Sequence, residues 1–468
     1  MDEILGQPLR EIAKAIATNQ VSAKQVTKAY LDKIESVNPA LNAIVRLEPE
    51  TAMKYADRCD LALKGGESPG KLFGVPMTIK DSLDTYDMVT TWGTSGRKDF
   101  RPGRDATCVE RVRNEGAVLM GKTNTPEFTL SFTTDNTIFG KTNNPFNLNR
   151  TPGGSSGGAA AIIAAGGSPF DIGTDTAGSI RLPCHFCGVA GIKPTTGRVP
   201  CTGNSLPVAG LLAPLTQPGP MARYVDDLIL LMEVISGPDN IDPHAIPVPW
   251  MDPYNINVEQ LRFGYHTDNG IKTPDASIVA AVNGVIQHLS DAHIAVVEVR
   301  PTGLEMTGFL FGQLFSADNG DMVNALLEDS HTDQPSPAVL ELIENTNNGA
   351  NASDIAQIIN LWHNYQSSML SYFDDFDILL TPVNAHTATT HDQETDFSAY
   401  TYTAAYNLTG WPSVVIRADT DPNGLPIGIQ VLARPFREDQ CLAVASWLEA
   451  KIGTFAAPLV DSPLPQDH

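Results

Sequence analysis

The sequence predicts one large α/β domain whose β-sheet carries helices on both faces. The chain has 468 residues, of which 42% are hydrophobic and 18% charged, so it can bury a core without disulfide or metal support. From Gly74 onward, short apolar segments of strand character alternate with helical segments, which is typical of α/β proteins. Repeats, low-complexity tracts and convincing linkers are absent from the sequence, so we expect residues 1–468 to form a single domain.

The N-terminal part, residues 1–65, is expected to be helical. A capping-box pattern at Ser22 precedes apolar residues that recur at helical spacing over 26–37. A second helical run covers 51–64 and stops at Gly65.

The next part of the chain, residues 70–200, contains the most distinctive motifs on alternating elements. Apolar segments predict strands at 75–79, 117–120 and 170–173, and helical patterns predict helices at 107–114 and 159–165.

Residues 238–375 form the least regular region, with a strand near 261–265 and helices near 276–289 and 354–373. The polar segment 345–353 within it is either a lid, an insertion or a plain surface loop. The chain then returns to the α/β pattern, with strands expected at 378–380, 413–416 and 427–432 and a final helix to about 451.

The charge balance restricts the partners. Thirty-one basic residues stand against 54 acidic ones, giving a net charge of −23. This balance disfavours nucleic acids and anionic membrane surfaces, because both require clustered Lys and Arg. The sequence starts without the basic and apolar segments of a secretion signal and has no run of 18 apolar residues, so we expect a cytoplasmic location.

The cysteines do not indicate a metal or redox centre. Six cysteines in a chain of this length fit a reducing compartment. Cys184 and Cys187 have CxxC spacing, but a zinc site requires a second ligand pair, and Cys201 stands alone. Two packed thiols are the simpler interpretation.

A glycine- and serine-rich segment, Gly153–Gly158, precedes an apolar helix. Its backbone N–H groups could bind an anion, but a phosphate loop would continue with a lysine, which is missing here. With Ser155 or Ser156 at the centre, the segment also matches the G-x-S-x-G nucleophile elbow. That elbow follows a strand, whereas the preceding residues 143–152 are rich in asparagine and proline.

A second motif combines a strand, Phe170–Gly173, with a turn of small residues, Thr174–Ser179. Successive N–H groups in such a turn can converge on one point and stabilise a developing oxyanion. Ser179 closes the turn, where its hydroxyl and these donors can meet one carbonyl group. A serine of this kind needs a base to become a nucleophile.

Lys80 is the candidate base, because the ten histidines of the chain all lie outside both motifs. It ends an apolar strand and can project into a dry site, where burial lowers the pKa of a lysine. The alternative is a solvated strand end, or a lysine paired with the adjacent Asp81.

Together these motifs resemble the amidase signature family. The resemblance is close over residues 70–200 and weaker at the C-terminal end; it is carried by Gly74–Pro76, Lys80–Asp81, Gly121–Asn124, Phe139–Gly140, Asn144–Phe146, Thr151–Gly158, Asp175–Pro183, Phe186–Gly188, Gly191–Pro194, Leu379–Pro382, Asn407–Pro412 and Gly424–Gln430. It implies a large mixed β-sheet covered by helices on both faces, the amidase signature fold.

The resemblance also implies a Ser–cis-Ser–Lys triad that needs neither cofactor nor metal. Ser179 would be the nucleophile, Ser155 the bridging serine with a cis peptide bond, and Lys80 the general base. The backbone N–H groups of Thr176, Ala177, Gly178 and Ser179 would form the oxyanion hole.

Two departures from the family pattern affect the pocket. Ala177 replaces the first of two glycines that often precede the nucleophile, and its methyl is expected to tilt the turn or narrow the pocket floor without abolishing activity. Residues 383–386 replace a segment that is often proline-rich. By position, Thr129 and Leu130 are expected near the acyl pocket, and the variable region 238–375 is expected to supply pocket wall or lid.

The resemblance implies hydrolysis of small-molecule carboxylic amides, and anilides, carbamates and esters are chemically adjacent substrates. An alternative is the glutaminase component of a tRNA-dependent amidotransferase, which works in a complex and shares this signature. A third hypothesis is a non-catalytic binding protein on the same scaffold. The oligomeric state stays open, with a homodimer among the candidates.

Overall fold

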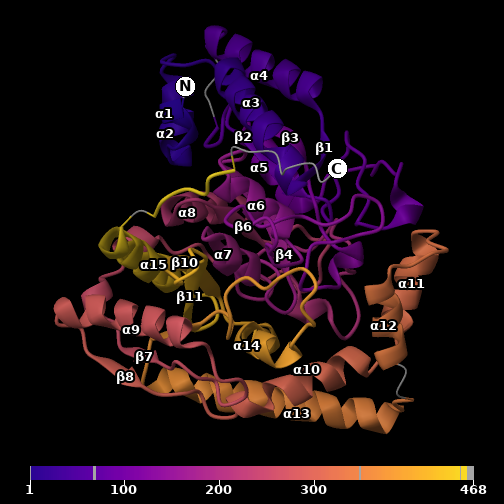
Figure 1. The fold of residues 1–468 in the computed structure, drawn as a ribbon, viewed down its shortest axis with the longest axis vertical. Helices are drawn as coiled ribbons and strands as arrows, with labels where there is room; N and C mark the ends of the chain where they lie inside the picture. The colour runs from indigo at the N-terminus through magenta and orange to yellow at the C-terminus, as the bar shows by residue number, and fades with distance from the viewer. Residues whose placement is uncertain (1, 67–69, 347–348, 454, 461–468) are drawn as a thin grey trace.

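Two hydrogen-bonded sheets form the centre of the molecule (Figure 1). The structure, a computed structural model, describes residues 2–66, 70–346, 349–453 and 455–460. The larger sheet has eight strands in the order β4 (Phe170–Asp175), β6 (Gln217–Ala222), β5 (Ala190–Lys193), β10 (Ser413–Thr420), β11 (Pro426–Ala433), β9 (Ile378–Pro382), β7 (Phe263–Tyr265) and β8 (Val296–Glu298). Neighbours from β4 to β9 are antiparallel and those from β9 to β8 are parallel, so the sheet is mixed.

The smaller sheet has the order β1 (Ile44–Leu47), β3 (Val118–Thr123) and β2 (Pro76–Lys80). The strand β2 lies next to β4 at the edge of the larger sheet. Side chains join the two sheets there: the buried Asp171 carboxylate of β4 accepts hydrogen bonds from the Lys80 N–H at 3.0 Å and from the Thr78 hydroxyl at 2.7 Å. It also accepts from Thr123 of β3 at 3.1 Å, so one carboxylate links three strands.

Fifteen helices surround these sheets in the described part of the chain. They are α1 (Asp2–Leu5), α2 (Leu9–Ala17), α3 (Ala23–Leu41), α4 (Pro49–Lys64), α5 (Thr107–Asn114), α6 (Gly157–Ala164), α7 (Arg181–Cys187), α8 (Val225–Ile235), α9 (Ala276–Asp291), α10 (Thr307–Ser316), α11 (Asp321–Asp329), α12 (Pro337–Thr346), α13 (Ala352–Leu370), α14 (Thr401–Leu408) and α15 (Glu438–Ile452). In Figure 1 the N-terminal helices cap one end, and α10 and α13 lie along the other.

The sheet is covered on both faces, as its residue pattern shows. In β10, Val414 and Ile416 pack into the main apolar cluster together with buried residues of α8, α9 and α15. The intervening Val415 packs into a second cluster with residues of α6 and α7. Successive side chains of a strand point to opposite faces, so the two clusters lie on opposite sides of the sheet. This confirms the expected fold class.

Several expected elements are confirmed closely, and others were missed. The capping box at Ser22 is formed, and the helix expected at 107–114 is α5. The expectation that residues 1–65 are entirely helical is wrong at Ile44–Leu47, because these residues pair with β3 as the short strand β1. In the polar segment expected at 345–353, α12 continues to Thr346, and residues 347–348 lie outside the described residues.

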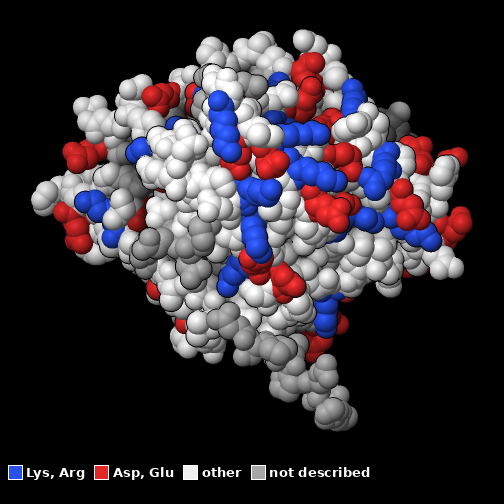
Figure 2. Space-filling model, turned by 90° about the horizontal axis from the view of Figure 1, so that it is seen from above, with Lys and Arg blue, Asp and Glu red and all other residues white. Residues whose placement is uncertain are grey.

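Surface charge is mixed rather than segregated at the N-terminal end of the molecule. Figure 2 looks down on this end, where basic and acidic side chains alternate. Ion pairs such as Lys24–Asp57, between α3 and α4, contribute to this pattern.

Within the described residues, no helix combines the length and apolar character that crossing a bilayer requires.

Candidate active site

Lys80, at the end of β2, lies fully buried at the junction of the two sheets. Its Nζ atom is 2.7 Å from the Ser155 Oγ atom, 2.9 Å from the Ser156 Oγ atom and 2.9 Å from the Thr174 Oγ1 atom. The next residue, Asp81, faces elsewhere: it accepts from Thr91 and lies 4.0 Å from Lys122. The side chain of Lys80 is therefore surrounded by hydroxyl groups instead of pairing with its neighbour in sequence.

Burial lowers the pKa of the Lys80 ammonium from its ordinary 10.5 to about 7, although Asp175 and Asp171 act in the opposite direction. Ser156 is the N-cap residue of α6, so the positive end of that helix also lies at this point. A helix N-terminus disfavours a further positive charge beside it. At neutral pH a large share of Lys80 is therefore an uncharged amine.

The two serine-bearing segments are joined through their backbones. The peptide bond between Gly154 and Ser155 is cis. The Ser156 N–H donates to the Ser179 carbonyl at 3.1 Å, which places the glycine-rich loop beside the turn after β4. The structure thus brings Lys80 and Ser155 together and places the backbone of Ser179 beside the loop that carries Ser155. Within the described residues, no direct hydrogen bond joins the hydroxyls of Ser155 and Ser179.

The turn from Thr176 to Ser179 is organised by the carboxylate of Asp175. This carboxylate accepts from the Gly178 N–H at 2.8 Å and from the Ile180 N–H at 3.1 Å. The amide of Gly178 therefore already has an acceptor, and it could join an oxyanion hole only by leaving the carboxylate. The amides of Thr176, Ala177 and Ser179 donate no hydrogen bond to this carboxylate in the described part of the chain.

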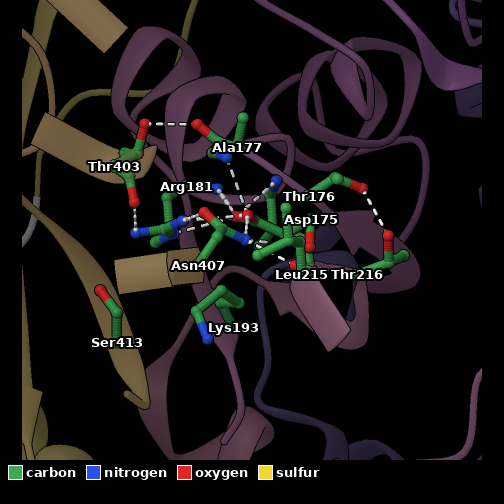
Figure 3. A network of polar contacts seen from close by, with 12 residues as sticks. Asp175, Thr176, Ala177, Arg181, Lys193, Leu215, Thr216, Thr403, Asn407 and Ser413 are labelled. Atoms are coloured by element: carbon green, nitrogen blue, oxygen red, sulfur yellow. Dashed lines mark hydrogen bonds and ion pairs between the residues drawn. The ribbon is translucent and has the colours of Figure 1, made fainter. Parts of the chain in front are cut away.

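Asp175 is itself held by Arg181 of α7 in a buried two-point ion pair, with N–O distances of 2.9 and 3.0 Å (Figure 3). Burial alone would raise the pKa of Asp175, but the charge and hydrogen bonds of Arg181 outweigh it and hold the pKa well below its usual range. The carboxylate is consequently ionised at neutral pH and available to all of its donors.

The methyl of Ala177 fits the turn. Ala177 is not among the described non-glycine residues with positive φ, so an alanine adopts this conformation without strain. By contrast, Gly178 has φ +127°, and a Cβ atom on it would lie 2.3 Å from Thr403 Oγ1. Glycine is required at the second of these two positions and not at the first.

A small apolar pocket adjoins the turn at Thr176. Its lining comprises Leu130, Thr176, Leu206, Pro207, Ala209, Leu212, Ala213, Thr216, Phe315 and Met322, none of which is charged, all within the described part of the chain. Thr176 and Thr216 bond to each other through their hydroxyls at 2.9 Å. Of the two residues expected near the acyl pocket, Leu130 is among the residues that line this small pocket, whereas the buried Thr129 is not; their expected place near the acyl group stays a prediction.

The contacts of Lys80 with Ser156, Thr174 and Asp171 were not predicted from the sequence. Ser156 and Thr174 both contact the amine of Lys80, and Asp171 holds its backbone N–H. Cys184 and Cys187 pack as buried free thiols in the cluster around α6 and α7, which bears out their interpretation as core residues.

Comparison with known proteins agrees with this arrangement. A family described as Amidase matches residues 25–442, nearly the whole chain. The chain belongs to this family. The resemblance to the amidase signature family is thereby confirmed, and with it the assignment of this amidase as an enzyme that hydrolyses amide bonds.

Individual relatives cover almost the full length of this amidase. It is 32% identical to a glutamyl-tRNA(Gln) amidotransferase subunit of Carboxydothermus hydrogenoformans, over 94% of this chain and 96% of the relative. It is 29% identical to an acylamidase of Rhodococcus erythropolis, over 94% of each chain. Among solved structures, 6-aminohexanoate cyclic dimer hydrolase with bound substrate superposes with a TM-score of 0.89 at 25% identity, over 98% of this chain and 100% of that one.

Proposed function

We propose that this amidase cleaves carboxylic amides through an acyl-enzyme on Ser179, with Ser155 as the bridging serine and Lys80 as the general base. The observation that carries the proposal is the 2.7 Å contact between Lys80 Nζ and Ser155 Oγ in a fully buried site. Burial that lowers the pKa of this lysine to about 7 supports the base role, because a base works best when its pKa lies near the working pH.

The surrounding hydroxyls fit a neutral amine. Its two N–H groups can donate to Ser156 and Thr174, which leaves the lone pair to accept the proton of Ser155. Ser155 in turn takes the proton of Ser179 as the Ser179 oxygen bonds to the substrate carbonyl carbon.

The N–H groups of the turn then stabilise the oxyanion. As the C–N bond breaks, the proton returns through Ser155 to the leaving amine. Water repeats the sequence on the acyl-enzyme and releases a carboxylic acid.

We further propose that the acyl group of the preferred substrate is apolar. The pocket beside Thr176 is only about 10 Å³ in this structure, so an acyl group would have to widen it, but its walls are uncharged, and Phe315 and Met322 come from the variable region 238–375. A charged group placed there would lose its hydration without gaining a partner. Anilides and carbamates with apolar acyl groups, and simple esters, are compatible with the same site.

The glutaminase component of a tRNA-dependent amidotransferase is the second candidate, favoured by the 32% identical relative from Carboxydothermus hydrogenoformans. Glutamine carries an ammonium and a carboxylate close to its amide group. The pocket beside the turn offers neither charge a partner, but at about 10 Å³ it holds no substrate group as it stands, so its lining does not decide between the two candidates.

The purified chain should hydrolyse hexanamide and benzamide without other proteins, with kcat/KM for glutamine lower by at least about tenfold. Release of ammonia measures each reaction. Glutamine hydrolysis that appears only in the presence of amidotransferase partner proteins would favour the second candidate. A chain that binds these amides and cleaves none of a panel of amides, anilides, carbamates and esters would favour a binding protein.

The assigned roles are tested by Ser179→Ala and Lys80→Met, each of which should lower kcat by about 10³-fold or more. Mass spectrometry of the wild type quenched with substrate should find the acyl group on Ser179. Matched controls are Ser290→Ala and Lys451→Met, because both side chains are exposed and outside the site. A folded Lys80→Met enzyme with near-normal turnover at pH 7 would contradict the base assignment.

A further inference from the structure

Two buried side chains of α14 reach the turn (Figure 3). The hydroxyl of Thr403 donates to the Ala177 carbonyl at 2.6 Å. One helical turn later, the Asn407 side-chain amide donates to the Asp175 carbonyl at 3.2 Å and to the Asp175 carboxylate at 2.9 Å. Residues four apart share a helix face, so one face of α14 binds the turn through two side chains.

These contacts fix N–H groups as well as carbonyls. The carbonyl and N–H of a peptide unit point in opposite directions in one plane. Holding the Asp175 carbonyl therefore sets the direction of the Thr176 N–H, which is one of the candidate oxyanion donors. The hydrogen bond to the Ala177 carbonyl fixes the peptide unit between Ala177 and Gly178. The N–H group of this unit, that of Gly178, is bound by Asp175.

The turn is closely packed against α14. A Cβ atom on Gly178 would meet the Thr403 hydroxyl at 2.3 Å and the Thr403 Cβ atom at 2.8 Å. The next carbonyl, that of Gly178, accepts from the Leu182 N–H at 2.7 Å, which in turn sets the direction of the Ser179 N–H. The carbonyls of Asp175, Ala177 and Gly178 are thus all held from outside the turn.

We propose that Thr403 and Asn407 are positioning residues: Asn407 sets the direction of the Thr176 N–H toward the developing oxyanion, and Thr403 anchors the neighbouring Ala177–Gly178 peptide unit so that the turn keeps this conformation. The proposal rests on the proposed function of the turn. Neither residue is required to touch the substrate. Their effect is on the direction of backbone donors, and it therefore appears in the transition state more than in substrate binding.

The decisive comparison is Thr403→Ala against Thr403→Ser, because both variants lose the γ-methyl and only the first loses the hydroxyl. We expect Thr403→Ala to lower kcat by about 10- to 100-fold while KM changes by less than about threefold. Thr403→Ser should recover most of the lost activity.

The affinity for a transition-state mimic distinguishes a positioning role from a merely structural one, because a merely structural role would leave this affinity unchanged. Phenylboronic acid forms a tetrahedral adduct with an active-site serine and should bind Thr403→Ala more weakly by about the factor lost in kcat. Thr409→Ala is the matched control: its hydroxyl, at the end of the same helix, has no hydrogen-bond partner within the described residues. Melting curves establish that each variant is folded.

Equal losses in Thr403→Ala and Thr403→Ser, or a Thr403→Ala enzyme with wild-type kcat, would overturn the positioning role. Asn407→Leu gives a second route if Thr403→Ala does not fold, with the same kcat loss and weaker boronate binding expected. Failure of the proposed function is distinguishable: the wild type would then not turn over the amide panel, or Ser179→Ala would remain active.

Discussion

Lys80 illustrates how one residue acquires a chemical role from its surroundings. A lysine at a strand end beside an aspartate is usually a solvated or paired charge. Here Asp81 belongs to a different cluster with Lys122, and the Lys80 amine forms no ion pair with a carboxylate in the described part of the chain. Without a paired negative charge, burial dominates and lowers the pKa of the amine.

This predicts a rise of kcat with pH through about 7. The protonated amine predominates below its pKa and cannot accept a proton, so turnover at pH 6 should be roughly a tenth of the plateau value. The pH profile of kcat for an amide substrate measures this, because titration of the base in the enzyme–substrate complex controls it.

Lys193 is the necessary control, because burial first and then Arg181 lower its pKa to about 7 as well. Its Nζ atom donates to the Pro194 carbonyl at 2.9 Å and makes none of the Lys80 contacts. Lys193→Met should therefore keep the inflection near pH 7. An inflection that disappears in this variant would assign the titration to Lys193 and contradict the role given to Lys80.

At the scale of elements, the turn between β4 and α7 depends on α7 itself and on α14, which lies far along the chain. Asp175 at the end of β4 is bound by Arg181 of α7 and Asn407 of α14. Strand β2 is joined to β4 by the carboxylate of Asp171. Lys80 and the turn thus lie on separate elements, and the buried carboxylates of Asp171 and Asp175 set the relative position of these elements.

The two residues before the nucleophile should respond differently to substitution. Gly178→Ala places a methyl in the left-handed region and against Thr403, so the turn must shift, and kcat/KM should fall by at least about 100-fold. Ala177→Gly relieves no strain and should stay within about fivefold of wild type. Steady-state kinetics on folded variants measure both effects; equal effects of the two substitutions would contradict this account.

Much of the α/β core was predictable because local patterns agree with tertiary structure there. The helix α5 and the strand β4 follow from their own residues. The strand β6 was missed because its sequence, Gln217–Ala222, contains two prolines and a glycine. The strand tolerates these prolines because β5 pairs only with Met221 and Ala222. Along Pro218 and Pro220 the strand pairs with β4 on one side only, where a residue without an N–H group can be accommodated.

The candidate active site likewise has parts that local sequence patterns predict and parts that they do not. The motifs around Lys80, Ser155 and Ser179 are contiguous in sequence and could be recognised singly. The contacts of Thr403 with Ala177 span 226 residues, and those of Asp171 with Lys80 span 91. Such contacts follow from sheet order and helix placement, which local patterns do not specify.

At the scale of the whole molecule, the N-terminal helix α2 is attached to the core through α8. The carboxylate of Asp227 in α8 accepts from the Leu9 N–H of α2 at 2.7 Å and is almost fully buried. Burial raises the pKa of Asp227 to about 8. Above that pH the folded protein contains a buried charge that the unfolded chain exposes to water.

Asp227→Asn should therefore stabilise the protein more at pH 9 than at pH 5. The folded pKa lies above the unfolded one, so the stability contributed by the neutral acid decreases as pH rises from about 4 to about 8. Asparagine keeps an acceptor for Leu9 and does not titrate. The difference in Tm between variant and wild type at the two pH values measures this effect; a difference that does not grow with pH would contradict it.

The reach of α14 across the chain also bears on when the protein becomes active during its synthesis. A ribosome that has passed residue 179 has already produced the lysine and both serines, yet the helix that steadies the turn begins at Thr401. A nascent or truncated chain would hold its reactive groups without the support that aims its backbone. If α14 positions the turn as proposed, we expect full turnover only after residues 401–408 have been synthesised and packed against it.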